Sequence, residues 1–162
     1  MSKSKSNRKV NKHGGGPIME IKRITPEQAK ELLDSNQGYM YLDVRTVPEF
    51  EAGHVPGAKN VPVVEPDASG RMQLNPRYVE IVEANFGKEV KCITGCQKGG
   101  RSIKAAELLL VAGFPHVLDM RGGFGGETDE MGRVTFPGWS LRGLPSTRES
   151  APEDRYENLA KK

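Results

Sequence analysis

The sequence predicts an α/β fold built around a parallel sheet. Signals for helices alternate with short apolar runs typical of strands along most of the chain. Strands separated by helices pair in parallel through right-handed crossovers. Cys96 directly follows one of the predicted strands, and ligands of open α/β sheets bind at the carboxyl ends of the strands. The fold class therefore places a reactive residue type where a binding site is expected.

The first predicted elements are a helix and a strand. Thr25-Pro26-Glu27-Gln28 combines an N-cap, a proline at the first helical position and a capping-box glutamine, and predicts a helix that runs to about Asp34. The apolar run from Tyr39 to Val44 predicts a buried strand. Asp43 and Arg45 lie at the end of this strand, where their charges can support a neighbouring loop.

Two further helices and two further strands follow. Asn75-Pro76 opens a helix, and Gly87 closes it. Residues 89–94 predict the strand that leads to Cys96, and His116–Met120 predicts one more short strand. Between these strands, Ile103–Ala112 predicts a helix. Its expected buried face contains Ile103, Ala106, Leu109 and Leu110.

The loop around Cys96 has the composition of an anion site. It reads Gly95-Cys96-Gln97-Lys98-Gly99-Gly100-Arg101-Ser102. Successive backbone N–H groups in a tight loop form a concave anion site, and the N-terminus of the following helix adds partial positive charge. Lys98 and Arg101 add two formal charges near the sulfur. These features favour the thiolate form of Cys96, which is the nucleophilic form.

Two other interpretations of this loop remain open from its composition alone. A free cysteine is often a small buried apolar residue, and many glycine-rich turns bind phosphate without covalent chemistry. A cysteine placed among glycines and cations is more typical of a nucleophile.

Two motifs resemble the rhodanese-like sulfurtransferases. The active-site loop of that family reads C-x-x-G-x-R-[ST], which Cys96, Gly99, Arg101 and Ser102 match. The second motif lies upstream and contains Tyr41-Leu42-Asp43-Val44-Arg45, Glu49-Phe50, Gly53-His54-Val55-Pro56-Gly57-Ala58, Asn60 and Pro62. The resemblance covers approximately residues 18–145 and is greatest for the single-domain members of plants and bacteria. It implies about five parallel strands with helices on both faces of the sheet.

The resemblance implies a transfer of sulfur in two steps. The Cys96 thiolate takes the outer sulfur of a donor and becomes a persulfide, which then passes the sulfur to cyanide, a small thiol or a protein thiol. The loop from Gln97 to Ser102, including Gly100, would hold the terminal sulfur through its N–H groups. Family members that use thiosulfate tend to have cationic loops, so Lys98 and Arg101 favour thiosulfate as the donor.

A phosphatase or an arsenate reductase is the main enzymatic alternative. Related cell-cycle phosphatases and other cysteine phosphatases use a C-x5-R loop that encloses a tetrahedral phosphate, whereas the spacing from Cys96 to Arg101 is C-x4-R. The shorter loop favours sulfur. A protein of a different class, a sulfur-relay or interaction module that accepts persulfide from a partner protein, also remains open.

The neighbours of the loop are expected to support it. Arg101 either holds the loop through an ion pair or binds the donor. We expect Asp43 to accept loop N–H groups or to pair with Arg101, and Arg45 to pair with Glu49. His54 is interpreted as a structural histidine rather than a general base, because an ionised thiolate needs no base.

Cys92 is expected to be a buried strand residue. If residues 90–94 form a strand, four residues place the Cα atoms of Cys92 and Cys96 about 13 Å apart, which is too far for a disulfide. The two cysteines have no second pair of ligands to complete a metal site, and the three histidines are scattered along the sequence. We therefore assign no metal, and we expect no cofactor.

The chain of 162 residues is long enough for one catalytic domain with tails. We assign residues 1–17 to a disordered basic tail, residues 18–146 to the domain and residues 147–162 to a polar C-terminal tail. The first 17 residues carry a charge of +5 within a net charge of +3, so the remainder is acidic by two charges. A solubilising role for this tail is favoured over contact with nucleic acid.

The composition also bears on the compartment. The N-terminal tail lacks the apolar core of a secretory signal, and no run in the sequence is long enough to span a membrane. An organelle transit peptide would be rich in arginine, but Arg8 is the only arginine of the tail. The simplest expectation is a cytoplasmic protein.

One segment departs from the family pattern. Relatives pass from a glycine pair to a tryptophan within a few residues, whereas Phe124–Gly138 lies between Gly122-Gly123 and Trp139. This insertion is expected to be a surface loop, and a mobile loop at the active-site mouth is the alternative. Phe124 and Trp139 are expected to pack in the core rather than to line the pocket.

Overall fold

The centre of the molecule is a parallel sheet, as the sequence predicts. The computed structural model describes residues 8–10 and 17–162. The five strands lie in the order β3 (Arg23–Ile24), β9 (Val117–Met120), β8 (Lys91–Gly95), β4 (Tyr39–Asp43) and β5 (Lys59–Asn60). All four neighbouring pairs are parallel. Asp43 pairs in register with Gly95, so the ends of β4 and β8 meet beside Cys96.

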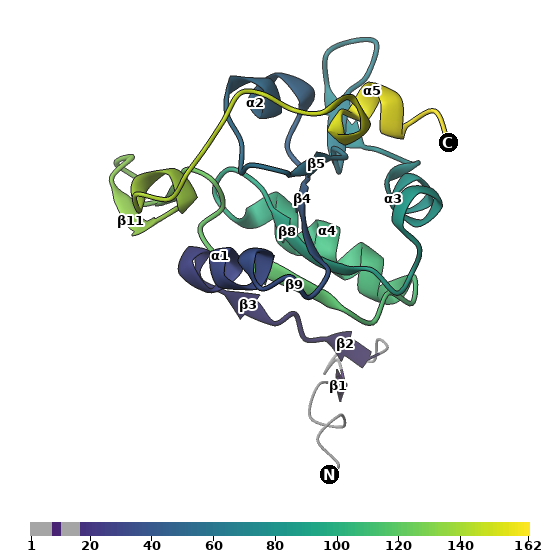
Figure 1. The fold of residues 1–162 in the computed structure, drawn as a ribbon, viewed down its shortest axis with the longest axis horizontal. Helices are drawn as coiled ribbons and strands as arrows, with labels where there is room; N and C mark the ends of the chain where they lie inside the picture. The colour runs from purple at the N-terminus through teal and green to yellow at the C-terminus, as the bar shows by residue number, and fades with distance from the viewer. Residues whose placement is uncertain (1–7, 11–16) are drawn as a thin grey trace.

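Helices cover both faces of the sheet (Figure 1). They are α1 (Pro26–Asp34), α2 (Val47–Ala52), α3 (Tyr78–Phe86), α4 (Gly100–Val111) and α5 (Tyr156–Leu159), with short 3₁₀ turns at Trp139–Leu141 and Pro152–Asp154. Alternate strand residues face opposite cores. Leu42 packs with residues of α3, α4 and α5, whereas Tyr41 packs with residues of α1 and α2. The predicted fold class and the two-sided arrangement are confirmed.

The helix after Cys96 begins earlier than the sequence predicted. It starts at Gly100 rather than at Ile103, because Gly99 adopts φ +107° and lets the chain turn directly from the loop into the helix. Of the predicted buried face, Ala106 and Leu109 are buried, whereas Ile103 and Leu110 are half-buried. The fully buried positions are Ser102, Ala105, Ala106 and Leu109.

The sequence analysis did not predict α2 as a helix. Thr46 caps it, because the Thr46 hydroxyl accepts the Glu49 N–H and the Glu49 carboxylate accepts the Thr46 N–H. Pro48 lies in the first turn. These residues form a capping-box motif that was readable in the sequence.

Three small antiparallel pairs lie outside the central sheet. They are β1 (Arg8–Val10) with β2 (Pro17–Met19), β6 (Val64–Pro66) with β7 (Met72–Leu74), and β10 (Gly126–Thr128) with β11 (Val134–Pro137). The disorder predicted for residues 1–17 falls mostly outside the described residues, so it stays a prediction.

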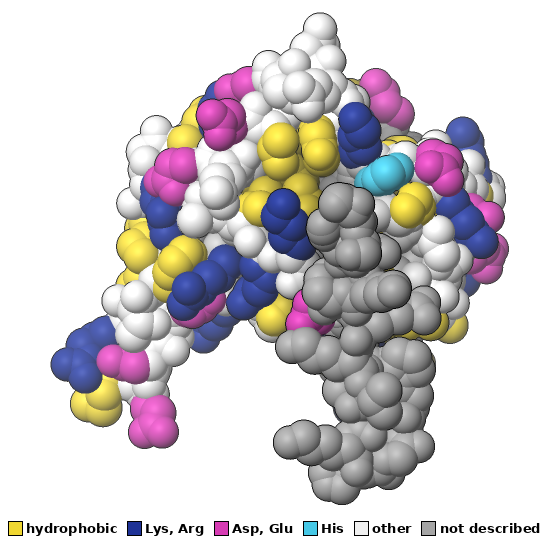
Figure 2. Space-filling view, turned by 90° about the horizontal axis from the view of Figure 1, so that it is seen from below, with side chains coloured by type: hydrophobic (Ala, Val, Ile, Leu, Met, Phe, Trp, Pro, Cys, Tyr) yellow, Lys and Arg dark blue, Asp and Glu magenta, His cyan; other side chains and the backbone are white. Residues whose placement is uncertain are grey.

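The insertion is a regular hairpin rather than an irregular loop. Strands β10 and β11 pair with a bulge, and Asp129 closes the turn by accepting the N–H groups of Met131 and Arg133. The hairpin projects from the body of the molecule (Figures 1 and 2). Met131 is 78% exposed at its tip.

The C-terminal segment folds back onto the domain. After the hairpin the chain passes α2 and ends near α3 (Figure 1). Thr147 and His54 exchange two backbone hydrogen bonds of 2.9 Å, and Lys59 pairs with Asp154. Leu159 on α5 is buried in the same core as Leu42. In the described part of the chain, no helix is long and apolar enough to cross a membrane.

Candidate active site

Cys96 lies in the turn between β8 and α4. Its side chain is buried, and the Gly99 N–H donates to its sulfur at 3.1 Å. The Ser102 Oγ lies 3.5 Å from the same sulfur. A cavity of about 340 Å³ opens above it, lined by Glu49, Cys96, Gln97, Lys98, Gly100 and Arg101. The sulfur is thus held by a donor at the base of a small cavity.

The loop around the sulfur offers further donors. The backbone N–H groups of Gln97, Lys98 and Gly100 have no acceptor within the described residues. Gly100 is also the first residue of the twelve-residue helix α4, whose N-terminus carries partial positive charge. Lys98 is exposed and has no carboxylate partner within the described residues. This environment favours an anion at and above the sulfur.

Arg101 is held by Glu49 on α2. The two guanidinium nitrogens Nη1 and Nη2 donate to the two carboxylate oxygens at 2.8 and 2.9 Å. Burial alone would raise the pKa of Glu49, but the bonds from Arg101 and from the Thr46 N–H outweigh it and lower this pKa to about 2. The expected pairs of Asp43 with Arg101 and of Arg45 with Glu49 are therefore wrong. Arg101 pairs with Glu49, which was expected to pair with Arg45, and Arg45 pairs with Asp43, which was expected to pair with Arg101.

Arg45 instead bonds to Asp43. Both side chains are almost fully buried, and Arg45 Nη2 and Nε donate to the Asp43 carboxylate at 2.7 and 3.0 Å. The two residues are two positions apart at the end of β4, so the bond is local. The same guanidinium donates to Gln97 Oε1 at 2.9 Å and to Gly53 O at 2.7 Å. Arg45 thus connects the end of β4 with the loop after Cys96.

The base of the hairpin supports the Cys96 loop from another side. Phe124 N–H donates to Cys96 O at 2.7 Å, and Gly125 N–H donates to Gln97 O at 2.9 Å. Gly123 adopts φ +64°, and a Cβ atom there would lie 2.4 Å from Cys96 O. The segment that departs from the family pattern therefore begins with residues whose backbone hydrogen bonds fix the Cys96 loop.

A buried polar cluster lies behind Cys96. The fully buried Asp119 on β9 accepts from Thr94 Oγ1 at 3.0 Å and from Arg23 Nε at 2.9 Å. Burial raises the pKa of Asp119 against the opposing hydrogen bonds of Ser102 and Arg23. The sequence analysis missed Asp119, although an acid inside an apolar strand was a visible signal.

The two aromatic residues at the ends of the insertion have different surroundings. Phe124 lines a neighbouring cavity of about 250 Å³ that shares Glu49 and Gln97 with the first, whereas Trp139 is buried and donates to Pro145 O. Core packing is therefore correct for Trp139, whereas the partly buried Phe124 both packs against the core and lines the cavity.

His54 and Cys92 have structural surroundings. The Nδ1 and Nε2 atoms of His54 lie 2.6 and 2.9 Å from the carbonyl oxygens of Phe50 and Glu149. Cys92 is fully buried in β8, and burial raises its pKa to about 12. No group of three or more His, Cys, Asp or Glu side chains within the described residues could hold a metal ion.

A buried cysteine at the N-terminus of a helix, inside a cationic loop at the end of a parallel strand, defines a cysteine-centred anion site. Residues 25–127 match the family model described as rhodanese-like domain. The chain belongs to this family.

Curated relatives share much of the chain. It is 46% identical over 109 residues to "Thiosulfate sulfurtransferase 16, chloroplastic" of Arabidopsis thaliana, covering 67% of this chain and 80% of the relative. It is 32% identical over 120 residues to "Thiosulfate sulfurtransferase GlpE" of Pseudomonas fluorescens, covering 74% of this chain and 92% of the relative. Among solved structures, Rv0390 from M. tuberculosis is 28% identical with a TM-score of 0.64, covering 78% of this chain and 97% of that chain.

Proposed function

We propose that this protein is a rhodanese-type sulfurtransferase that moves sulfane sulfur from thiosulfate to a thiophilic acceptor through a persulfide on Cys96. The observation that carries the proposal is the sulfur of Cys96, which accepts the Gly99 N–H beneath a cavity lined by Lys98. The names of the relatives from Arabidopsis and Pseudomonas support the reaction class.

The chemistry needs two displacements at sulfur. In the first, the Cys96 thiolate attacks the outer sulfur of thiosulfate, a new S–S bond forms, and the S–S bond of the donor breaks as sulfite leaves with the electron pair. In the second, the acceptor attacks the terminal sulfur, and the Cys96 thiolate leaves. Splitting one transfer into two steps in this way is covalent catalysis.

The charges around the loop support a dianionic donor. Glu49 neutralises Arg101, so Lys98 is the cation of the cavity lining without a carboxylate partner within the described residues. The N–H groups of Gln97 and Gly100 add neutral donors that suit a diffuse sulfur anion. Arg101 then supports the loop, whereas Lys98 attracts the donor.

Turnover with defined substrates tests the proposal. Thiocyanate formation from thiosulfate and cyanide is followed for the wild type, Cys96→Ser and Cys92→Ala. We expect turnover by the wild type and Cys92→Ala and none above background by Cys96→Ser. Turnover by Cys96→Ser, or hydrolysis of p-nitrophenyl phosphate in place of sulfur transfer, would contradict the proposal.

Deletion of residues 1–17 separates the enzyme from the relay module. If the protein is an enzyme that does not use its basic tail, the shortened chain keeps both thiosulfate turnover and any transfer from a persulfidated partner. If the protein is a relay that docks a partner through its basic tail, the deletion lowers transfer from a persulfidated partner and leaves thiosulfate turnover unchanged.

A further inference from the structure

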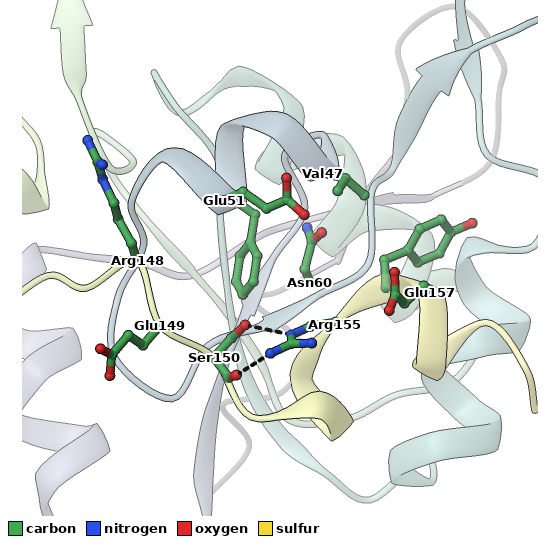
Figure 3. Close-up of a pocket in the computed structure, with 10 residues that line it drawn as sticks. Val47, Glu51, Asn60, Arg148, Glu149, Ser150, Arg155 and Glu157 are labelled. Carbon is green, nitrogen blue, oxygen red and sulfur yellow. Dashed lines mark hydrogen bonds between the residues drawn. The ribbon is translucent and has the colours of Figure 1, made fainter.

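A second and larger cavity lies against α2. Its volume is about 670 Å³, within the usual range of small-molecule sites. Val47, Phe50 and Glu51 of α2 form one wall (Figure 3). Glu49 lines the Cys96 cavity instead, because positions 47, 50 and 51 share a helix face and position 49 lies on the opposite one. Helix α2 therefore separates the two cavities.

The opposite wall is formed by the C-terminal segment. This wall lies beyond residues 25–127, the part that matches the family model. Its position is fixed by the bridge between His54 and Thr147 and by the ion pair of Lys59 with Asp154. The cavity is therefore a feature that the family match does not cover. The wall contains Arg148, Glu149, Ser150, Arg155, Tyr156 and Glu157.

A buried and unsatisfied oxygen lies beneath this cavity. Asn60 is fully buried, and its Nδ2 donates to the carbonyl oxygens of Asp43 and Arg45 at 3.0 Å each. These two acceptors fix which end of the amide is the nitrogen. The Asn60 Oδ1 has no hydrogen-bond partner, and it is the one such buried side-chain atom in the described part of the chain. Buried carbonyl groups are rarely left unpaired, so a donor within the cavity would satisfy it.

Two carboxylate side chains line the same cavity. They belong to Glu51 of α2 and Glu157 of α5, and both are labelled in Figure 3. Two carboxylates and one amide oxygen suit an ammonium group, which has three donors and no acceptor. These lining residues of the cavity thus favour a cation.

The opposite wall of the cavity carries a cation, Arg155. Arg155 donates to the backbone oxygen and the hydroxyl of Ser150 at 3.0 and 3.2 Å, and it has no carboxylate partner within the described residues. Arginine is well suited to bind a carboxylate. Arg148 and Glu149 extend away from the other lining residues (Figure 3). Val47, Phe50 and the ring of Tyr156 supply apolar surface between the charged groups.

We propose that this cavity binds a free aliphatic α-amino acid. Its ammonium group would bond to Asn60 Oδ1, Glu51 and Glu157, its carboxylate to Arg155, and its side chain would pack on Val47 and Phe50. The same Asn60 amide holds the backbone oxygens of Asp43 and Arg45. The ligand would therefore stabilise the end of β4, which supports the Cys96 loop.

Calorimetry with L-norleucine tests the proposal. Pentylamine lacks the carboxylate of this probe, and hexanoate lacks its ammonium group. We expect saturable binding of L-norleucine and at least about tenfold weaker binding of each analogue, because each loses a charged hydrogen-bonding group. The titrations are repeated with the Cys96→Ser variant, so that their outcome does not depend on sulfur transfer.

Variants of the walls complete the test. Arg155→Gln and Glu157→Gln should each weaken L-norleucine binding about tenfold. Glu153→Gln is the matched control, since Glu153 is exposed on the same segment and does not line the cavity, and it should change the affinity less than twofold. Absence of saturable binding at millimolar L-norleucine, equal binding of pentylamine, or equal affinities of all three variants would overturn the proposal.

Discussion

The ion pair between Glu49 and Arg101 predicts how strongly α2 stabilises the Cys96 loop. Glu49→Gln keeps the size of the side chain and removes its charge. The two bonds of 2.8 and 2.9 Å then lose their charge assistance, and one of the two oxygens becomes an amide nitrogen that cannot accept. We expect a loss of stability that depends on pH.

The magnitude follows from the pKa of Glu49. Lowering it from 4.5 to about 2 corresponds to about 3.4 kcal/mol for all partners of the carboxylate together, Thr46 included, if they were fully shielded from solvent. The side chains of Arg101 and Glu49 are 29% and 33% exposed, so solvent screening reduces the contribution to about 1–2 kcal/mol. We expect Glu49→Gln to lower the free energy of unfolding by this amount at pH 7.

The sign of the pH dependence is fixed by the same pKa. The pKa of Glu49 is lower in the folded state than in the unfolded chain, so its stabilisation is complete above pH 4.5. It is lost as the pH falls from about 5 towards 1, below both pKa values, where the carboxylate is protonated in both states. The difference between the wild type and Glu49→Gln should therefore be largest at neutral pH, should be mostly lost at pH 2 and should vanish only below it.

Urea unfolding measures the contribution of the ion pair to the free energy of unfolding. The proteins compared are the wild type, Glu49→Gln, Arg101→Gln and the double variant. The double-mutant cycle at pH 7 should give a coupling of about 1–2 kcal/mol between the two side chains. A coupling below about 0.3 kcal/mol, which is within the usual additivity of independent sites, would refute the reasoning. A difference between wild type and Glu49→Gln that stays constant down to pH 2 would also refute it.

Three further substitutions have defined outcomes. Cys92→Ala should leave turnover within about twofold, because a thiol with a pKa of about 12 is not a nucleophile at neutral pH. It should lower the free energy of unfolding by about 1 kcal/mol, because the buried thiol is removed from the core. Steady-state kinetics and urea unfolding measure the two effects. Gly123→Ala should slow persulfide formation at least about tenfold, because its Cβ would displace the Cys96 loop. The control Gly132→Ala, at φ +82° with no atom within 4 Å of its Cβ, should not slow persulfide formation. Lys98→Gln should raise the KM for thiosulfate about fivefold. Lys104→Gln, on the helix α4 that follows the loop and outside the cavity lining, should leave the KM unchanged.

Local signals predicted most of the fold. The capping box at Thr25, the apolar run that forms β4 and the glycine after α3 gave elements within a few residues of their bounds. These signals are local because capping and strand burial depend on neighbours in the chain. The order of the strands rests on long-range pairing, which the alternation of helices and strands restricts but does not fix.

The partners within the site were less predictable. The loop motif placed Cys96 and its donors, but the sequence does not show that Glu49 reaches Arg101, 52 positions away. Asp43 and Arg45 are neighbours, and their bond could have been predicted from the two-residue spacing at the end of a strand. The hydrogen bonds from the hairpin base to Cys96 and Gln97 depend on tertiary packing, so no local pattern shows them.

The intact mass of the protein after incubation with thiosulfate tests the central claim most directly. The account predicts that the reduced wild type gains one sulfur atom, that the addition is reversed by cyanide, and that Cys96→Ser gains none. An unchanged mass of the folded, reduced wild type, or an equal addition to Cys96→Ser, would contradict a persulfide on Cys96 formed from thiosulfate.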